Sequence, residues 1–206
     1  AVFPLLKRAG VVDVPSDRSS HTEVTVRGGG IAIGCGVTVA TIVATVWNIL
    51  ENGAFGLGGI LMSVGFLVLT WCYSVIGMSD DLDSLQPVAR LIGQVALALI
   101  FSGCITLVSD HGISQVIVFA AIGVTLVNAV NFVDGLNGYV TGWAIVTGSW
   151  YAFVASWTGQ DDVMLLALAL TGAACGFLPF NIGRARAFLG DTGSYGIGAA
   201  VFALAV

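Results

Sequence analysis

The chain has 206 residues, of which 57% are hydrophobic and only 9% are charged, and its formal net charge is −5. Soluble domains carry about a quarter charged residues, so this chain has too few of them to cover a water-facing surface. Its seven Lys and Arg residues are also too few for a nucleic-acid binder that relies on a basic patch. The composition therefore predicts an integral membrane protein, and its apolar richness argues against disorder.

Long charge-free segments divide the chain into candidate spans. They cover residues 28–50, 52–79, 91–109, 111–133, 135–160 and 163–183, and another apolar segment starts at residue 192. Because a helix needs about 20 apolar residues to cross the hydrocarbon core, six full crossings are expected. Continuous apolar stretches argue against barrel strands, in which apolar and polar residues alternate. We predict an all-α polytopic transmembrane helix bundle, one integral-membrane domain over residues 1–206, with partial spans at both truncated ends.

The basic residues predict the orientation of the bundle. If the hairpins alternate, the polar loops at about 7–28, 78–92, 131–138 and 183–193 share one membrane face. Every basic residue of the chain belongs to that face: Lys7, Arg8, Arg18, Arg27, Arg90, Arg184 and Arg186. By the positive-inside rule, this face is predicted to be cytoplasmic. Four acids in the opposite turns are expected to be solvated: Glu51, Asp110, Asp161 and Asp162.

An acidic pair follows the second long span. Asp80 and Asp81 are adjacent, so their charges repel, and either one of them works as a base or the pair meets a divalent cation. A solvated acidic turn is the alternative. Because these acids lie at a span end rather than at the midplane, the pattern favours chemistry at the membrane surface over ion-coupled transport.

Amides and glycines gather at the end of a later span. Asn128 and Asn131 are one helical turn apart and share a face, and amides at the end of an apolar helix need polar partners. Asp134-Gly135 and Asn137-Gly138 are turn signals. A turn that is merely rich in Asn and Gly is the alternative here.

Two further polar segments complete the predicted face. Arg184 and Arg186 precede the Gly190-Asp191-Thr-Gly-Ser194 run, whose backbone N–H groups favour anions and whose Asp191 could hold a metal. The alternative is a basic loop with Asp191 as a helix cap.

Near the start of the chain, Arg18 and Arg27 could clamp phosphates, His21 could shuttle a proton, and the Gly28-Gly29-Gly30 run allows close backbone approach. A flexible tether is equally plausible for this segment. Together the four loops contain the groups that bind Mg²⁺ and a phosphorylated substrate, so phosphoryl transfer is the leading reaction class.

These motifs resemble those of a known family. They are Asp13-x-Pro15-x-x-Arg18-x-x-His21, Arg27-Gly-Gly-Gly, Asp80-Asp81 with Leu85, Pro87, Arg90 and Gln94, Asn128-x-x-Asn131-x-x-Asp134-Gly135-x-Asn137-Gly138, and Phe188-Leu-Gly-Asp191-Thr-Gly-Ser. Their order and spacing are similar to those of the polyprenyl-phosphate N-acetylhexosamine-1-phosphate transferases (glycosyltransferase family 4), especially the bacterial glycan-initiating branch. The resemblance spans nearly the whole chain.

The resemblance implies a reaction. Such enzymes transfer a sugar 1-phosphate from a UDP-sugar to undecaprenyl phosphate and release UMP, with Mg²⁺ or Mn²⁺ as cofactor. It implies a multi-pass protein of the bacterial inner membrane with a cytoplasmic active site, acting in cell-envelope glycan synthesis such as O-antigen and lipopolysaccharide assembly. The implied partners are the two substrates and the lipid bilayer, without nucleic acid, and a homodimer is a candidate assembly.

The resemblance also implies roles for individual residues. Asp191 and Asn131 are implied as metal ligands, and Asp80, Asp81 and Asp134 as catalytic acids, the adjacent pair deprotonating or positioning the lipid phosphate. The implied substrate-binding residues are His21, Arg27, Arg90, Asn128, Asn137, Arg186 and Phe188. Asn137 stands where much of the family has Asp, so a charge is lost at this position.

Two other readings compete with this one. A CDP-alcohol-type phosphotransferase would show Ala-Arg after Asp-Gly, whereas Asp134-Gly135 is followed by Leu136-Asn137. A transporter or inactive scaffold, in which the acids are turn caps, would release no UMP. The sequence identifies neither the sugar nor whether transfer takes one step or two.

Overall fold

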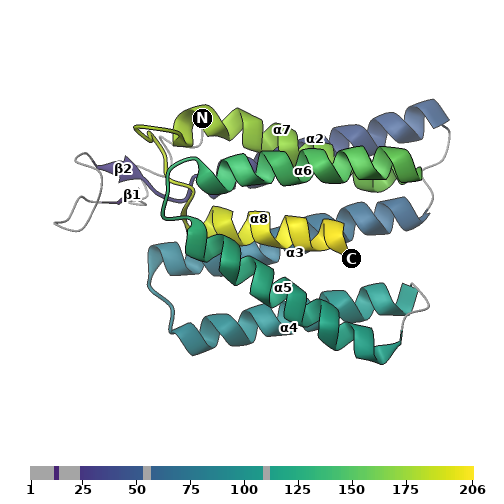
Figure 1. The fold of residues 1–206 in the computed structure, drawn as a ribbon, viewed down its shortest axis with the longest axis horizontal. Coiled ribbons are helices and arrows are strands. Elements are labelled where there is room, and N and C mark those ends of the chain that lie inside the picture. Colours follow the sequence, from purple (N-terminus) through teal and green to yellow (C-terminus); the bar gives the residue numbers. More distant parts are fainter. Residues whose placement is uncertain (1–11, 14–23, 53–56, 109–111) are drawn as a thin grey trace.

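The computed structural model describes residues 12–13, 24–52, 57–108 and 112–206, and it forms the all-α bundle predicted from the sequence (Figure 1). Two short strands, β1 (Val12–Asp13) and β2 (Thr25–Val26), pair antiparallel near the start of the chain. The helices that follow are α2 (Gly30–Asn52), α3 (Leu57–Leu82), α4 (Pro87–Val108), α5 (Ile113–Val133), α6 (Tyr139–Thr158), α7 (Asp161–Asn181) and α8 (Gly190–Ala205).

Five of these helices, α2, α3, α4, α5 and α7, are long and apolar enough to cross a membrane. The sixth expected span corresponds in position to α6, which has 20 residues but is not among the five. Large apolar side chains are exposed on the outer faces of the helices, for example Trp47 of α2, Val68 of α3 and Ile100 of α4. A water-soluble protein rarely exposes such continuous apolar surface, whereas a multi-pass membrane protein presents it to lipid.

Helix α8 forms the centre of the bundle. The sequence presented it only as the start of a partial span, yet all of its residues except Asp191 and Ala205 are buried. It packs most extensively against α3 and also against α5 and α2, and Figure 1 shows it between these elements. A helix that is apolar on all sides is expected to lie inside a bundle.

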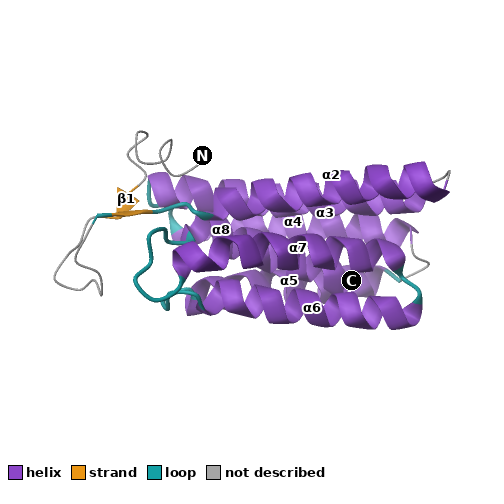
Figure 2. Cartoon of the chain, turned by 90° about the horizontal axis from the view of Figure 1, so that it is seen from above, coloured by secondary structure: helices purple, strands orange, loops and turns teal. Residues whose placement is uncertain are grey.

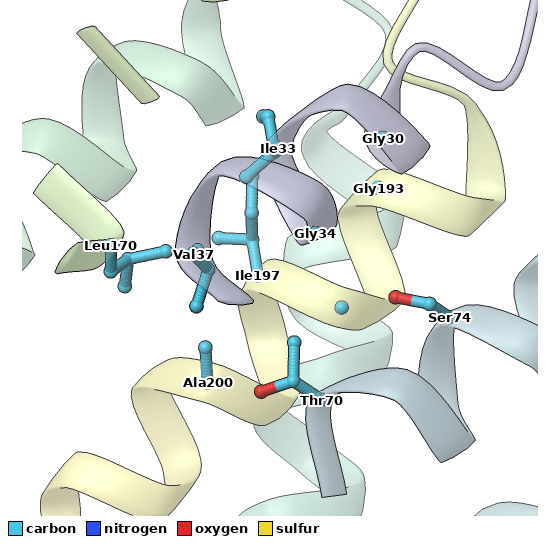
Figure 3. A pocket seen from close by; sticks show the side chains of 11 residues that line it. Gly30, Ile33, Gly34, Val37, Thr70, Ser74, Leu170, Gly193, Ile197 and Ala200 are labelled. Carbon is cyan, nitrogen blue, oxygen red and sulfur yellow. The ribbon is translucent and has the colours of Figure 1, made fainter. Parts of the chain in front are cut away.

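Glycines allow α2 and α3 to touch the first turn of α8. A Cβ added at Gly77 of α3 would lie 2.2 Å from the backbone oxygen of Asp191, and one added at Gly30 of α2 would lie 2.1 Å from the Cα of Gly193. Figure 3 shows the small cavity beside this contact, lined by residues that include Gly30, Gly193 and Ser74. Backbone contacts this close fix the position of Asp191 relative to α3.

The helices alternate in direction, so the described connections at 83–86, 134–138 and 182–189 lie at one end of the bundle together with β2, as Figures 1 and 2 show. We call this the polar end. The helices extend into the loops predicted at 78–92, 131–138 and 183–193. Asp80 and Asp81 therefore occupy the last turn of α3, and Asp191 occupies the first turn of α8. The connections are shorter than predicted because helix ends carry the polar residues.

Candidate active site

Four acids meet at the polar end, and we call them the acidic cluster: Asp80, Asp81, Asp134 and Asp191. The carboxyl groups of Asp80 and Asp191 interact directly, and Asp81 accepts hydrogen bonds from the first turn of α8. The negative charges of Asp191 and Asp81 both act on Asp134. The structure thus brings together acids that are up to 111 positions apart along the chain.

Asp81 is the most enclosed member of the cluster, with a side chain that is 0% exposed. Its Oδ1 accepts from the Asp191 amide at 3.0 Å and from Nε of Arg27 at 2.8 Å. Its Oδ2 accepts from the Thr192 amide at 2.9 Å and from the Thr192 hydroxyl at 2.7 Å. Arg27, which was expected to bind phosphate, is therefore paired with a buried acid, although 40% of its side chain remains exposed.

Asp80 is also buried, but it faces the α3–α4 connection. Its Oδ1 accepts from the Leu85 amide at 2.8 Å, and its Oδ2 pairs with Nη1 of Arg90. Arg90, which the resemblance implied as a phosphate contact, thus offsets the charge of Asp80. This ion pair joins the end of α3 to the start of α4.

Asn131 and Asp191, the two residues implied as metal ligands, are in contact. Asn131 donates from Nδ2 to Oδ1 of Asp191 at 2.8 Å and to the Ser194 hydroxyl at 3.0 Å. Asn128, one turn earlier, donates instead to Oε1 of Gln94 at 2.6 Å and to its own helix. The two amides share a helix face as predicted, but they have different partners, and the structure shows Asn128 with Gln94 rather than with an acid.

Asp134 differs from the other acids of the cluster. It follows the last residue of α5 and is half-buried. Within the described part of the chain, its carboxylate forms neither a hydrogen bond nor an ion pair. Burial, and then the nearby negative charges of Asp191 and Asp81, raise the pKa of Asp134 to about 8, although the positive charge of Arg27 opposes the shift. Asp134 can therefore exchange a proton near neutral pH, and its carboxylate has no hydrogen-bond or ion-pair partner among the described residues.

The donor set of the cluster fits a magnesium ion that also binds substrate. No group of three or more His, Cys, Asp or Glu side chains is arranged to hold a metal by itself in the described ranges. Protein sites for Mg²⁺ commonly supply only one or two carboxylates, and water and substrate phosphates complete the shell. Four carboxylates and two guanidinium groups, when all are ionised, leave two negative charges, which a divalent cation would offset.

A second group of polar residues surrounds the 182–189 connection. Asn137 is exposed and donates from Nδ2 to the Gly183 carbonyl at 2.9 Å. Arg186 is exposed, and its guanidinium lies 4.8 Å from the centre of the Phe180 ring. Phe188 is half-buried. His21 lies outside the described residues.

The segment after β2 is fixed to this connection. Val26 and Ala187 form a parallel bridge, the Phe188 amide donates to the Val26 carbonyl at 2.8 Å, and the Gly29 amide donates to the Phe188 carbonyl at 2.9 Å. Residues 25–30 are therefore not the flexible tether that was the alternative for this region. The pairing was not foreseen because two-residue strands leave almost no periodic signal.

Asn181, at the end of α7, was not assigned a role from the sequence. It is 3% exposed, and its Oδ1 accepts from the Gly138 amide at 3.0 Å and from the Thr141 hydroxyl at 2.9 Å. Its Nδ2 donates to the Ala187 carbonyl at 3.1 Å. An amide at the end of an apolar helix needs polar partners, and that signal could have identified Asn181 as the residue that joins α6 to the 182–189 connection.

The chain is similar to sugar-phosphate transferases of bacteria. Decaprenyl-phosphate N-acetylglucosaminephosphotransferase of Mycolicibacterium smegmatis is 30% identical over 93% of the chain and 52% of its own length. Phospho-N-acetylmuramoyl-pentapeptide-transferase of Geobacillus thermodenitrificans is 34% identical over 86% of the chain and 59% of its own length. The chain thus spans about half the length of these relatives. The family model for glycosyl transferase family 4 matches residues 63–206, most of the chain. The chain therefore belongs to glycosyl transferase family 4.

Proposed function

We propose that this chain is the catalytic membrane part of an enzyme that transfers N-acetylhexosamine 1-phosphate from a UDP-sugar to undecaprenyl phosphate and releases UMP. The acidic cluster at one end of an apolar bundle is the observation that carries the proposal. A polyprenyl phosphate must keep its tail in lipid while its phosphate reaches polar groups, and the polar end offers such groups at the end of membrane helices. The names of the relatives, which include a decaprenyl-phosphate N-acetylglucosaminephosphotransferase, support this reaction class.

Asp191 and Asn131 would hold the metal ion. Their side chains are in contact through Nδ2 of Asn131, and because an amide binds a metal through its oxygen, the Asn131 amide would turn to present Oδ1 to the ion. When bound, Mg²⁺ or Mn²⁺ supplies charge stabilisation for the diphosphate of the UDP-sugar. Water and phosphate oxygens would complete the shell.

Asp134 is the acid best suited to accept a proton from the lipid phosphate. Asp80 and Asp81 are each paired with an arginine, whereas the carboxylate of Asp134 has no such partner among the described residues. A base is most effective when its pKa lies near the working pH, and the pKa of Asp134 is raised to about 8 by burial and by the charges of Asp191 and Asp81. An oxygen of the lipid phosphate then attacks the β-phosphorus, the bond to the bridging oxygen breaks, and UMP leaves with that oxygen.

We place the active site on the cytoplasmic face of the bacterial inner membrane. The four basic residues in the described ranges, Arg27, Arg90, Arg184 and Arg186, belong to the polar end, while Asp161 starts a helix at the opposite end. Positive charge marks the cytoplasmic side of membrane proteins. The product would be the first lipid-linked sugar of a cell-envelope glycan, and the expected homodimer stays a prediction.

The test uses the full-length protein that contains this chain, in membranes with Mg²⁺ and undecaprenyl phosphate. A panel of UDP-sugars is supplied, and both UMP and lipid-linked sugar are measured. We expect Mg²⁺-dependent formation of both products in equal amounts with at least one UDP-sugar. If a known relative forms product under the same conditions and this protein forms none with any sugar, the proposal is wrong and the inactive scaffold gains support.

A further inference from the structure

We propose that Asp81 is a positioning residue, which places Asp191 and Arg27 for catalysis and neither accepts the substrate proton nor binds the metal. This inference rests on the proposed function and divides the adjacent pair of acids into two different roles. It also gives Arg27 a second role beside phosphate binding, because Arg27 forms an ion pair with Asp81.

The carboxylate of Asp81 has no acceptor capacity left. An ionised carboxylate offers about four lone-pair positions. Four donors occupy them in this structure: the amides of Asp191 and Thr192, the Thr192 hydroxyl and Nε of Arg27. A proton acceptor or metal ligand needs an oxygen that the substrate or the ion can reach, and the side chain of Asp81 is 0% exposed.

Three of these four donors belong to the first turn of α8, and two of the three are backbone amides. The first N–H groups of a helix have no partner within the helix. Helix α8 has Leu189 before its first residue, and no side chain at that position caps it. Asp81 of α3 therefore serves as the cap from a neighbouring helix. The approach is so close that a Cβ added at Gly190 would lie 2.7 Å from Oδ2 of Asp81.

The cap fixes the residue that would hold the metal. The amide of Asp191 is bound to Asp81, while its carboxylate reaches Asn131 at 2.8 Å. The fourth donor, Arg27, uses Nε for Asp81 and remains 40% exposed, and its positive charge acts on both Asp134 and Asp191. One buried carboxylate thus fixes the helix start and an arginine at the same site.

The experiment compares Asp81→Asn with Asp83→Asn, in which an exposed acid two residues away is replaced in the same way. Three quantities are measured in the full-length protein: hydrogen exchange at the amides of Asp191 and Thr192, the affinity for Mn²⁺, and the pH dependence of transfer. We expect Asp81→Asn to speed exchange at both amides and to weaken Mn²⁺ binding about 10- to 100-fold, a range typical of residues that orient metal ligands. The residual rate should still rise with pH as Asp134 loses its proton, and this rise should move to lower pH because the charge of Asp81 no longer raises the pKa of Asp134. Asp83→Asn should behave as wild type.

A second pair of variants covers the case in which Asp81→Asn does not fold. Thr192→Val removes the hydroxyl that donates to Asp81, while Thr192→Ser keeps a hydroxyl at that position. Weaker Mn²⁺ binding in the valine variant, with recovery in the serine variant, would support positioning.

Loss of the acid limb in Asp81→Asn, with unchanged amide exchange and Mn²⁺ affinity, would show that Asp81 is the base and overturn the inference. If the wild-type protein forms no product, the proposed function fails. The exchange and Mn²⁺ measurements still decide the role of Asp81 in that case.

Discussion

The polar end contains two regions with opposite properties: the acidic cluster, and the segment of residues 182–186, which we call the arginine loop. In the cluster, acids from α3 and α8 are bound to amides and arginines of neighbouring segments, and the side chain of Asp81 is 0% exposed. In the arginine loop, Arg184 and Arg186 are exposed, and the guanidinium of Arg186 lies over the Phe180 ring and 3.5 Å from the Pro179 carbonyl.

The two regions therefore differ in when they become organised. The acidic cluster is organised before substrate binds, whereas substrate must order the arginine loop. The acidic cluster is fixed by backbone contacts between α3 and α8, so its geometry does not depend on substrate. Preorganised charges of this kind contribute most to transition-state stabilisation. An exposed arginine is ordered only when substrate binds, and a contact that is equally strong before and during the reaction changes KM rather than kcat. We therefore expect substitutions in the cluster to lower kcat and substitutions in the arginine loop to raise KM.

The largest effect is expected for Asp191→Asn. The change keeps the size of the side chain and removes the charge that would hold the metal. Loss of this interaction should lower kcat about a thousandfold or more, which corresponds to roughly 4 kcal/mol of transition-state stabilisation. Initial rates of UMP release at saturating Mg²⁺ measure the effect. Retention of more than a tenth of the wild-type rate would contradict the assignment.

Asp134 should control the pH dependence of the reaction. Its pKa is raised to about 8 by burial and by the charges of Asp191 and Asp81. Below this pH the carboxyl group is protonated and cannot accept a proton, so the rate should rise with pH, about tenfold per unit, and level off. Bound Mg²⁺ should move this limb to lower pH because a nearby cation favours the carboxylate.

Asp134→Asn should lower the plateau about a hundredfold and remove the limb. Transfer rates measured from pH 5 to 9, with enzyme stability checked at each pH, show whether Asp134 causes the pH dependence. An acid limb of the same position and slope in the variant would assign the titration to another group.

The contact between α3 and α8 is tested by Gly77→Ala. Its new Cβ would lie 2.2 Å from the Asp191 backbone oxygen, so the helices must separate, at a cost of about 1–3 kcal/mol. For a protein of this size we expect Tm to fall by about 2–4 °C for each kcal/mol. Gly172→Ala in α7 is the matched control, because its Cβ would meet no neighbouring atom within 4 Å. Equal thermal unfolding of the two variants would show that the contact does not fix the cluster.

The smallest effect is expected in the arginine loop. Arg186→Ala should raise KM for the UDP-sugar about tenfold with little change in kcat, because a hydrogen bond to a charged group contributes about 1.5 kcal/mol. Arg184→Ala removes the same charge two residues away. If both variants raise KM equally, general attraction of the nucleotide explains the effect and Arg186 has no specific contact.

The sequence predicted the bundle because its evidence is local. Continuous apolar segments long enough to span a membrane predicted the helices, and the basic residues predicted which loops share a face. The proximity of Asn131 and Asp191 could also be predicted, because alternating helices place both residues at the same end of the bundle. The central position of α8 could not be predicted, because a helix with apolar residues on all sides suits lipid as well as a protein interior.

Individual roles within the cluster depended on contacts that the sequence does not display. Adjacent acids such as Asp80 and Asp81 point in different directions on a helix, and only the structure shows that the donors to Asp81 include the amides of α8. The pairing of Arg27 with Asp81 joins residues 54 positions apart in different elements, and nothing in the motif of either one indicates it. The acids of the cluster are of one residue type, and their burial and their hydrogen-bond partners give them different roles.

The most direct test of the account is the binding of Mn²⁺ to the full-length protein, measured by electron paramagnetic resonance in the presence of a UDP-sugar. The measurement decides whether the polar end, and not the opposite end, holds one divalent cation. We predict one tightly bound Mn²⁺ per chain, lost in Asp191→Asn and retained in Asp161→Asn, which removes an exposed acid at the start of α7. Equal Mn²⁺ binding by wild type and Asp191→Asn would contradict the account.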